Sequence, residues 1–289
     1  MLPFGPYEVQ SVVNGTIRLD GGAMFGVVPK VLWHRHYDVD ADNRILLATR
    51  TLIAVDPAAN RVILVDTGCG SKWEPEQAER YAVTVDNDAI SRALAQWGLT
   101  TADVTDVVIT HLHFDHNGGL CNWADGNKTK TTLRYPQARH WIHRRHWDHA
   151  HRPYVKDKAS FIPADFETLA DAGVLSFVDS DLGWVDGPYD GLAWFVSNGH
   201  TPCQLHPIFG TGADGLIFSG DIVPTSVHVR PGWVMAYDVR PITTIEEKQM
   251  MYERCLGEGY KLAFPHDPKT GLTQITGTVK RPEARPLDQ

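Results

Sequence analysis

The first third of the chain alternates hydrophobic and polar residues in the manner of β-strands. Residues 7–19 follow this pattern, with Asn14-Gly15 as a candidate turn within them. Residues 45–55 and 61–65 are rich in β-branched residues and are separated by the turn sequence DPAAN. We expect these two segments to pair as a hairpin, whose second strand runs into DTGCG at residues 66–70.

A segment with helical periodicity follows the predicted hairpin and is itself followed by another predicted strand. Within residues 86–97 the apolar positions recur at helical spacing, and Gly98 closes the segment. Residues 107–110 form a short apolar strand that runs directly into the histidine-rich sequence THLHFDHNGG. Open α/β sheets bind ligands at the carboxyl ends of their strands, so this position favours a functional role for the sequence.

The second half of the chain reads as short strands between helices. Residues 140–172 are predicted to be helical and polar, and residues 244–256 form an amphipathic helix. Strands are predicted at residues 175–178, 192–196, 205–209, 216–219 and 262–264. No linker or repeat divides the chain, so we expect one domain over residues 1–275. Residues 276–289 are rich in proline and charge and are predicted to be a loose tail.

Composition narrows the class of protein without identifying it. The 289 residues are 43% hydrophobic and carry a net charge of −8, and no run of lysine and arginine suits nucleic acid. No apolar stretch is long enough to cross a membrane, and the N-terminal sequence has no signal-peptide pattern. The four cysteines are widely spaced, as expected of reduced thiols. We therefore expect a cytoplasmic protein.

The histidine-rich sequence carries four metal-binding side chains in six positions. In an extended segment side chains alternate, so His111, His113 and Asp115 are predicted to point one way, and His116 turns off that line. This geometry suggests that the first two histidines bind one ion and that Asp115 and His116 bind a second. Two ions require further ligands from other parts of the chain.

Three later residues supply candidates for these missing ligands. His200 follows the predicted strand at residues 192–196, Asp221 follows the one at 216–219, and His266 follows the one at 262–264. Each of them alone could be an ordinary surface histidine or turn aspartate. Together they fit the requirement for two ions, which favours the metal-binding interpretation.

By these motifs the chain resembles the metallo-β-lactamase superfamily of dinuclear hydrolases. The matching features are H-x-H-x-D-H at residues 111–116, Gly199-His200, Gly220-Asp221, the late His266 and the DTG at residues 66–68. The resemblance implies an α/β fold, a four-layer αββα sandwich, with both ions at one edge between the sheets. It assigns the first ion to His111, His113 and His200, the second to Asp115, His116 and His266, and the bridging position to Asp221. Asp66 would orient a ligand.

A finer resemblance lies outside the ligands. The sequences DGGAMFGVVPK at residues 20–30 and GDIVPTSVHVRPGWVMAYDVRP at residues 220–241 are similar to the branch of N-acyl-homoserine lactonases and methyl parathion hydrolase. That branch usually continues with glycine and histidine after HTP, whereas this chain has Cys203 and Gln204. Neither position is a ligand, so metal binding should survive, but the loop beside the first ion is altered.

The resemblance predicts a dinuclear metal-dependent hydrolase that attacks its substrate with a metal-bridging hydroxide flanked by the catalytic residues Asp115 and Asp221. Opening of a lactone or cleavage of an ester is the favoured reaction, and hydrolysis of a phosphotriester is the alternative. Zinc is the expected metal, with iron or manganese as alternatives. The expected partner is a small-molecule substrate with an acyl or aryl tail, and the sequence leaves a homodimer open.

Aromatic and sulfur-containing residues near the motifs are candidates for the substrate pocket. The candidates for the wall of the pocket are Met24, Phe25, Trp33, Trp233 and Met235, whose irregular spacing suits loops better than a core stripe. Tyr237 and His228 are further candidates for the pocket. Both follow the bridging aspartate and are candidate proton donors to the leaving group. Cys69 and Cys203 are predicted to be buried filler rather than nucleophiles.

Other interpretations of the sequence are weaker. The run HWIHRRHWDHAH at residues 140–151 could bind metal, but a solvated face or pocket wall is favoured because no partner ligands lie nearby in the sequence. Di-iron oxidoreductases of the superfamily carry glutamate in place of His113, which counts against redox chemistry. The full ligand set counts against an inactive binding protein.

Overall fold

The computed structural model describes residues 1–126 and 128–287 and consists of two packed sheets covered by helices. The first sheet contains, in spatial order, β1 (Leu2–Phe4), β2 (Tyr7–Asp20), β3 (Arg44–Asp56), β4 (Arg61–Val65), β6 (Asp106–Val108), β9 (Arg139–His143) and β10 (Leu175–Val178), with β5 (Thr84–Val85) paired to β2. The second contains β11 (Gly183–Asp186), β12 (Leu192–Ser197), β13 (Gln204–Phe209), β14 (Leu216–Phe218), β15 (Lys261–Ala263), β16 (Leu272–Thr278) and β17 (Arg281–Pro286). A separate hairpin joins β7 (Cys121–Trp123) and β8 (Thr131–Leu133).

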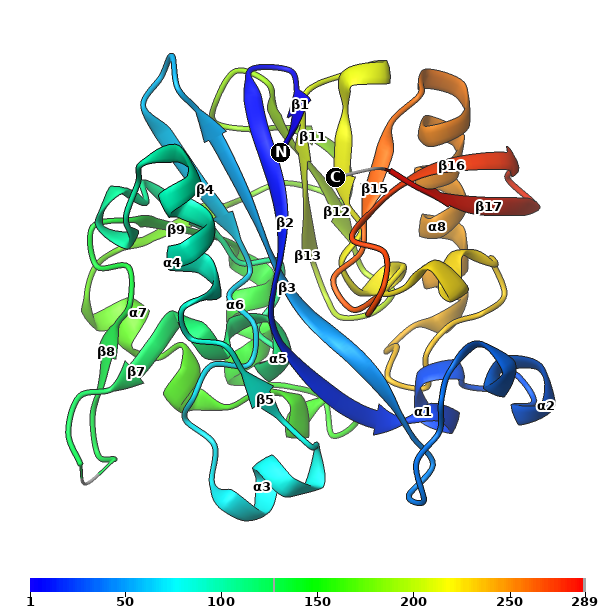
Figure 1. The fold of residues 1–289 in the computed structure, drawn as a ribbon, viewed down its shortest axis with the longest axis horizontal. Coiled ribbons are helices and arrows are strands. Elements are labelled where there is room, and N and C mark those ends of the chain that lie inside the picture. The colour runs from blue at the N-terminus through cyan, green and yellow to red at the C-terminus, as the bar shows by residue number, and fades with distance from the viewer. Residues whose placement is uncertain (127, 288–289) are drawn as a thin grey trace.

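Helices lie on the outer face of each sheet, so the predicted four-layer αββα sandwich is confirmed (Figure 1). The helices are α1 (Gly21–Phe25), α2 (Lys30–Trp33), α3 (Pro75–Arg80), α4 (Ala89–Leu94), α5 (Phe114–Asn117), α6 (Arg144–His151), α7 (Thr168–Asp171) and α8 (Pro241–Glu258). α4, α6 and α7 cover the first sheet and α8 covers the second (Figure 1). None of the helices in the described residues is both long and apolar enough to span a membrane.

Three buried clusters fill the spaces between these layers. One lies between the outer helices and the first sheet and includes Leu94 and Leu169, and another joins the facing sides of the two sheets and includes Val65 and Phe209. A third packs α8 against the second sheet through Met251 and neighbouring residues. Each helical layer buries one apolar face, whereas each sheet packs against helices on one side and against the other sheet on the other. The sandwich therefore accounts for the helical periods and for long apolar runs such as β3.

The predicted hairpin of residues 45–55 and 61–65 is confirmed as β3 and β4, which pair in antiparallel register. The candidate turn at Asn14-Gly15 is wrong, because β2 continues through it with a β-bulge. A Cβ atom on Gly15 would lie 2.4 Å from the Thr84 carbonyl oxygen, so glycine allows β5 to approach β2 closely.

Two other predicted segments differ from the structure. Residues 139–143 form β9, a parallel neighbour of β6, so the predicted helix over residues 140–172 is wrong at its start. In its described part, residues 276–287, the predicted tail is not loose: β17 pairs with β16 along its length, and the backbone N–H of Leu287 donates to the Leu272 carbonyl oxygen. Proline and charge marked this segment as polar, but its pairing partner β16 was not predicted as a strand.

Candidate metal centre

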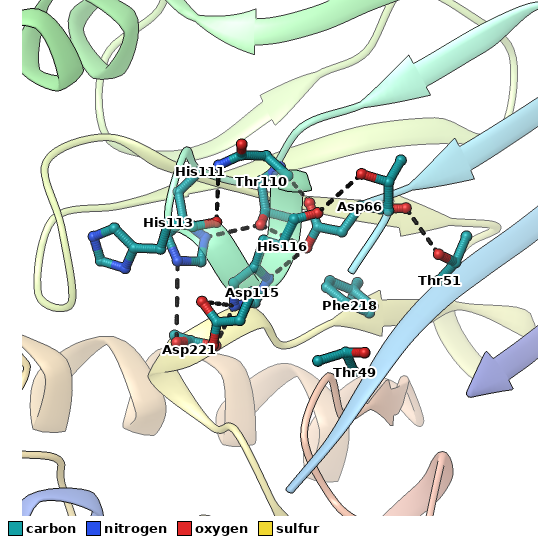
Figure 2. Close-up of polar contacts among 12 residues, drawn as sticks. Thr49, Thr51, Asp66, Thr110, His111, His113, Asp115, His116, Phe218 and Asp221 are labelled. Atoms are coloured by element: carbon teal, nitrogen blue, oxygen red, sulfur yellow. Dashed lines mark hydrogen bonds and ion pairs between the residues drawn. The ribbon is translucent and has the colours of Figure 1, made fainter. Parts of the chain in front are cut away.

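The histidines and aspartates singled out in the sequence meet at one edge of the sandwich. His111 and His113 follow β6, His200 follows β12, and His266 follows β15. Asp221 lies in a short 3-10 helix after β14. β6 belongs to the first sheet and the other strands to the second, so the site lies where the ends of both sheets meet (Figure 2).

Helix α5 changes how the histidine-rich sequence presents its side chains. The chain is extended up to His113 and turns into α5 at Phe114, so the predicted extended line ends before Asp115. Asp115 and His116 lie in the helix and still reach the site, beside His266. The prediction that His111, His113 and Asp115 share one continuous strand face was therefore wrong, although all three side chains reach the site.

Three overlapping groups of side chains have ligand atoms within 4.8 Å of one another. We call His111, His113 and His200 the first group, and Asp115, His116 and His266 the second group. The remaining set joins His111 and His116 to Asp221 and lies between the two groups. All seven predicted metal ligands are therefore brought together.

The carboxylate of Asp221 lies between the two groups. One of its oxygens, Oδ1, lies 3.2 Å from Nε2 of both His116 and His266. The other oxygen, Oδ2, lies 3.3 Å from Nε2 of His200. Each oxygen therefore faces a different group, as a carboxylate shared by two cations would.

Several buried atoms of the site lack an ordinary hydrogen-bond partner. These atoms are Nε2 of His111, Nε2 of His113 and Oδ1 of Asp221. Ring nitrogens also face each other, with 3.0 Å between Nε2 of His116 and of His266. Buried polar groups without partners are costly, and converging nitrogen and oxygen lone pairs suit divalent cations. The residues therefore fit a metal centre.

The nitrogens on the far side of four rings are held by the protein. Nδ1 of His116 lies 2.8 Å from the Asp66 carboxylate, and Nδ1 of His200 lies 2.9 Å from that of Asp238. Nδ1 of His266 lies 2.9 Å from the Ala48 carbonyl oxygen, and Nδ1 of His111 lies 3.0 Å from the Thr110 hydroxyl. These contacts place the proton on Nδ1 and direct the Nε2 lone pair into the site.

Asp66 has the contact with a ligand that was predicted for it (Figure 2). Its carboxylate also accepts hydrogen bonds from the backbone N–H of Thr110 at 2.9 Å and from the Thr110 hydroxyl at 2.8 Å. The Thr51 hydroxyl donates to the Asp66 carbonyl oxygen at 3.0 Å. The backbone of Asp66 has a φ of 56°, in the left-handed region. A network from strand β3 and the loop after β6 thus holds this aspartate in an uncommon conformation.

The electrostatics of the site differ from ligand to ligand. Burial alone would lower the pKa of His116 and of His200, but nearby carboxylates, Asp221 foremost, raise it above its usual value, so metal binding at these two rings competes with protonation. Burial lowers the pKa of His111 and of His113 well below its usual value, so both rings are neutral at pH 7. Burial alone would raise the pKa of Asp221, but the adjacent imidazoles, His116 foremost, hold that pKa well below its usual value. Neutral imidazoles and an ionised carboxylate are the forms that bind metal.

A pocket of about 160 Å³ opens onto Asp115, Asp221 and three of the histidines. Its apolar wall consists of Leu19, Met24, Leu47, Phe114 and Met235. Its polar lining consists of Tyr81, Lys156, Ser160 and Tyr237. Of the seven pocket candidates, Met24, Met235 and Tyr237 line it.

The other four pocket candidates lie outside this lining. Phe25 and Trp33 are buried and stack on each other, with ring centroids 5.2 Å apart. His228 is buried against Phe25 and contacts the Met24 carbonyl oxygen and the Thr225 hydroxyl through its two nitrogens. Trp233 packs edge-on against Phe25. These residues form a small core behind the pocket.

Sequence reasoning missed several residues of the site. Asp238, which holds His200, lies in a segment quoted only for its resemblance, and nothing in its spacing marks it as a partner of a histidine. Leu19 and Leu47 come from strands β2 and β3, far from the metal-binding motifs in the sequence. They could be found only by knowing how the sheets pack.

The second histidine run differs from its predicted role. His140, His143 and His146 are buried, whereas His151 is exposed, so a solvated face describes only the end of the run. His149 contacts the Asp157 carboxylate at 2.7 Å. The helix α6 thus turns part of its histidine-bearing face toward the interior.

Cys69 and Cys203 are buried and free, as expected of filler. Burial raises the pKa of both thiols, so they are protonated and poor nucleophiles at neutral pH. Neither geometry nor charge gives them a catalytic role.

Known proteins resemble this chain in both sequence and fold. The sequence profile described as "Metallo-beta-lactamase superfamily" matches residues 51–276. N-acyl homoserine lactonase AttM of Azorhizobium caulinodans is 28% identical over 182 residues, which are 59% of this chain. The matched region spans 61% of that relative's length.

Solved structures with the same fold cover nearly the whole chain. A probable metal-dependent hydrolase from Staphylococcus aureus has a TM-score of 0.84 and 26% identity, over 98% of this chain and 99% of its own. AidC, a dizinc quorum-quenching lactonase in complex with a product, has a TM-score of 0.78 and 19% identity, over 100% of this chain and 97% of its own. With its profile match, its sandwich and its edge cluster of histidines and aspartates, this chain belongs to the metallo-β-lactamase superfamily.

Proposed function

We propose that this protein is a dinuclear metal-dependent hydrolase that opens lactones or cleaves esters. The observation that carries the proposal is the Asp221 carboxylate, which faces a different group of metal-binding side chains with each oxygen. The first group would hold one ion and the second group the other, with Asp221 between them. The mixed nitrogen and oxygen donors suit zinc, and iron or manganese could take the same place.

The bound ions would supply Lewis acidity toward the substrate oxygen and a water whose pKa is lowered toward neutrality. The chain supplies the positions of the reacting groups. Asp66 and Asp238 fix the rings of His116 and His200, so the ligand nitrogens need little rearrangement. Asp115 and Asp221 border the pocket and would orient the attacking water through their carboxylates.

The pocket supports a compact ester or lactone with an apolar tail. Its wall of leucine, methionine and phenylalanine side chains suits an acyl or aryl group beside the charged floor. AttM and AidC are named as lactonases, which supports the same class of substrate.

The structure separates the two candidate proton donors. Both nitrogens of His228 have partners inside the protein, so this ring has no proton to offer to a substrate. Tyr237 lines the pocket, and burial raises the pKa of its phenol well above its usual value. Tyr237 therefore keeps its proton at neutral pH and is proposed to donate a hydrogen bond to the leaving oxygen.

The proposal is tested by comparing substrates with metal-replete enzyme. Values of kcat/KM would be measured for acyl-homoserine lactones, δ-lactones, aryl esters, a phosphotriester and a β-lactam, with Asp221→Asn as the inactive control. We expect at least one lactone or ester to exceed the phosphotriester tenfold and metal analysis to give close to two ions per chain. A tenfold preference for the phosphotriester would overturn the substrate class. Full activity without metal would overturn the mechanism.

A further inference from the structure

His146 stands out among the buried histidines that the proposed mechanism does not use. It lies in α6, in the outer helical layer, and its side chain is fully buried. Its Nε2 accepts a hydrogen bond from the backbone N–H of Leu112 at 2.8 Å. Its Nδ1 lies 2.8 Å from the backbone carbonyl oxygen of Pro202. One ring thus joins two loops of the chain.

The two backbone partners fix the protonation of this ring. A backbone N–H can only donate, so Nε2 of His146 must be unprotonated, and a carbonyl can only accept, so Nδ1 must carry the proton. Burial lowers the pKa of His146 to about 3, which keeps the ring in this neutral form. His146 therefore acts as a rigid spacer with one acceptor and one donor.

The loops that His146 joins carry all of the first group. Leu112 lies between His111 and His113, and Pro202 lies two residues after His200. The first loop follows β6 in one sheet and the second follows β12 in the other. His113 and His200 approach each other across this gap, with 3.1 Å between Nδ1 of the former and Nε2 of the latter. The ring therefore spans the boundary between the sheets beside these ligands.

We propose that His146 is a positioning residue that sets the distance between the His111–His113 loop and His200, and thereby the affinity of the first group for a divalent cation. The proposal rests on the metal centre of the proposed function. It assigns a role to the histidine run that neither the ligand set nor the pocket explains. The ring of His146 lies edge-on to that of His111, with 6.1 Å between their centroids, but both of its hydrogen bonds go to backbone groups, so its polar effect passes through the backbone.

The same run offers a matched control. His143 is also buried, and its Nε2 contacts the Ser180 carbonyl oxygen while its Nδ1 accepts from the backbone N–H of Arg145. Neither contact reaches a loop with a metal ligand. His143 also caps the first turn of α6, so His143→Ala controls for a general loosening of this helix while leaving both hydrogen bonds of His146 in place.

The experiment measures metal affinity with one group disabled at a time. Zn²⁺ affinity would be measured by competition with a chromophoric chelator in His266→Ala protein, where the first group remains intact, and in His113→Ala protein, where the second remains intact. In the first background His146→Ala should lower the affinity by about 10- to 100-fold, the usual effect of losing an outer partner of a ligand. In the second background the change should stay below about threefold.

A second variant separates positioning from loss of packing. Glutamine has both an acceptor and a donor, so His146→Gln should recover at least half of the lost affinity on a logarithmic scale. His143→Ala should lower the melting temperature without changing either affinity. These readouts do not depend on turnover.

Three results would overturn the proposal: no effect of His146→Ala in the His266→Ala background, equal losses in both backgrounds, or the same loss with His143→Ala. Failure of the proposed function looks different. Unmutated protein would then bind no Zn²⁺, or it would bind two ions and hydrolyse neither lactones nor esters. In the second of these cases the affinity measurements still decide the role of His146.

Discussion

Cys203 and Gln204 replace the glycine and histidine that the resembled branch usually carries. Cys203 has a φ of 54°, in the left-handed region that glycine adopts without strain. Its side chain is nonetheless buried in the core between the sheets. Burial of a small apolar group offsets part of the backbone cost, so the loop keeps its shape with a residue that is poorly suited to it.

Gln204 takes the place beside a metal ligand. Its side-chain amide lies 3.2 Å from Nδ1 of His111. The hydroxyl of Thr110 also faces this nitrogen, and it gives its own proton to Asp66. Rotation of the Gln204 amide presents Oε1, a buried atom without another partner, to the N–H of His111. Gln204 can therefore hold this ring in place as a carbonyl or hydroxyl does elsewhere in the site.

Gln204→Leu should lower the Zn²⁺ affinity of the first group by about tenfold, because His111 loses a polar partner at Nδ1. Gln204→His, which restores a ring nitrogen, should stay within about threefold of the unmutated protein. Chelator competition in the His266→Ala background measures both. Gln137→Leu, at an exposed glutamine, is the control. Equal affinities for the leucine and histidine variants would contradict this role.

Single residues show what the sequence could and could not predict about the site. His200, Asp221 and His266 were predictable because each follows a strand and has the chemistry of a ligand. Asp238, Gln204 and His146 act through contacts between segments far apart in the chain, and their spacing carries no such signal. Phe25 and Trp33 could not be assigned from the sequence to the core or to the pocket, because aromatic residues fill both.

At the scale of elements, α8 holds two loops of the site through adjacent residues. The Glu247 carboxylate accepts from the backbone N–H groups of Asn198 and Gly199, just before His200. The Lys248 ammonium donates to the carbonyl oxygens of His228 and Trp233, at 2.9 and 2.5 Å. Pro241 begins this helix and Gly259 ends it in a left-handed conformation, so local sequence fixes both of its ends.

Lys248 should give the protein a measurable dependence of stability on pH. Burial lowers its pKa to about 7, whereas an unfolded lysine has a pKa of about 10.4. Between these values the unfolded chain binds more protons, so the free energy of unfolding rises with pH. Relative to Lys248→Met, the unmutated protein should gain about 2 kcal/mol between pH 7.5 and 9.5.

Urea unfolding of metal-replete protein at these two pH values measures the difference. Lys158→Met, at an exposed lysine, should instead follow the unmutated protein at both. Parallel pH curves for Lys248→Met and the unmutated protein would show that the buried ammonium is not destabilised in the folded state.

The periodicity of apolar residues predicted the type of most helices and strands, and it failed where pairing with a neighbouring strand determines the conformation. The strands at residues 192–196 and 205–209 were predicted because their apolar runs are bounded by turn residues, and they match β12 and β13. Residues 140–143 seemed helical because their histidines recur at three-residue spacing. Pairing with β6 makes this segment a strand, a tertiary effect that outweighs the local pattern.

At the scale of the whole molecule, the four layers followed from the resemblance to a family rather than from periodicity. Local patterns indicated strands and helices but not the order β4, β6, β9 and β10, which crossover connections create. The hairpin of β16 and β17 was missed for a related reason. Its two strands stabilise each other, and each alone looks like a polar terminal segment.

Removal of residues 281–289 should therefore destabilise the whole domain. The truncation removes the partner of β16 and exposes the edge of the second sheet, including the buried Thr273. We expect the melting temperature to fall by at least about 5 °C, which corresponds to a loss of a few kcal/mol. Differential scanning calorimetry measures the change, and a chain ending at Leu287 is the control. Coincident melting curves would mean that β17 contributes nothing to stability.

Strand β17 also determines how the second sheet meets other molecules. The backbone N–H of Leu287 donates to Leu272, so in the adjoining pair of Pro286 and Thr273 the backbone groups point away from the partner strand. Hydrogen-bonded and non-hydrogen-bonded pairs alternate along an antiparallel ladder, and Pro282 lies four residues before Pro286, so its backbone groups also point outward. Proline has no N–H, so two of the outward positions of this outermost strand have no proton to donate. A foreign strand would find few hydrogen bonds here, and this edge is thereby guarded against edge-to-edge aggregation at high protein concentration.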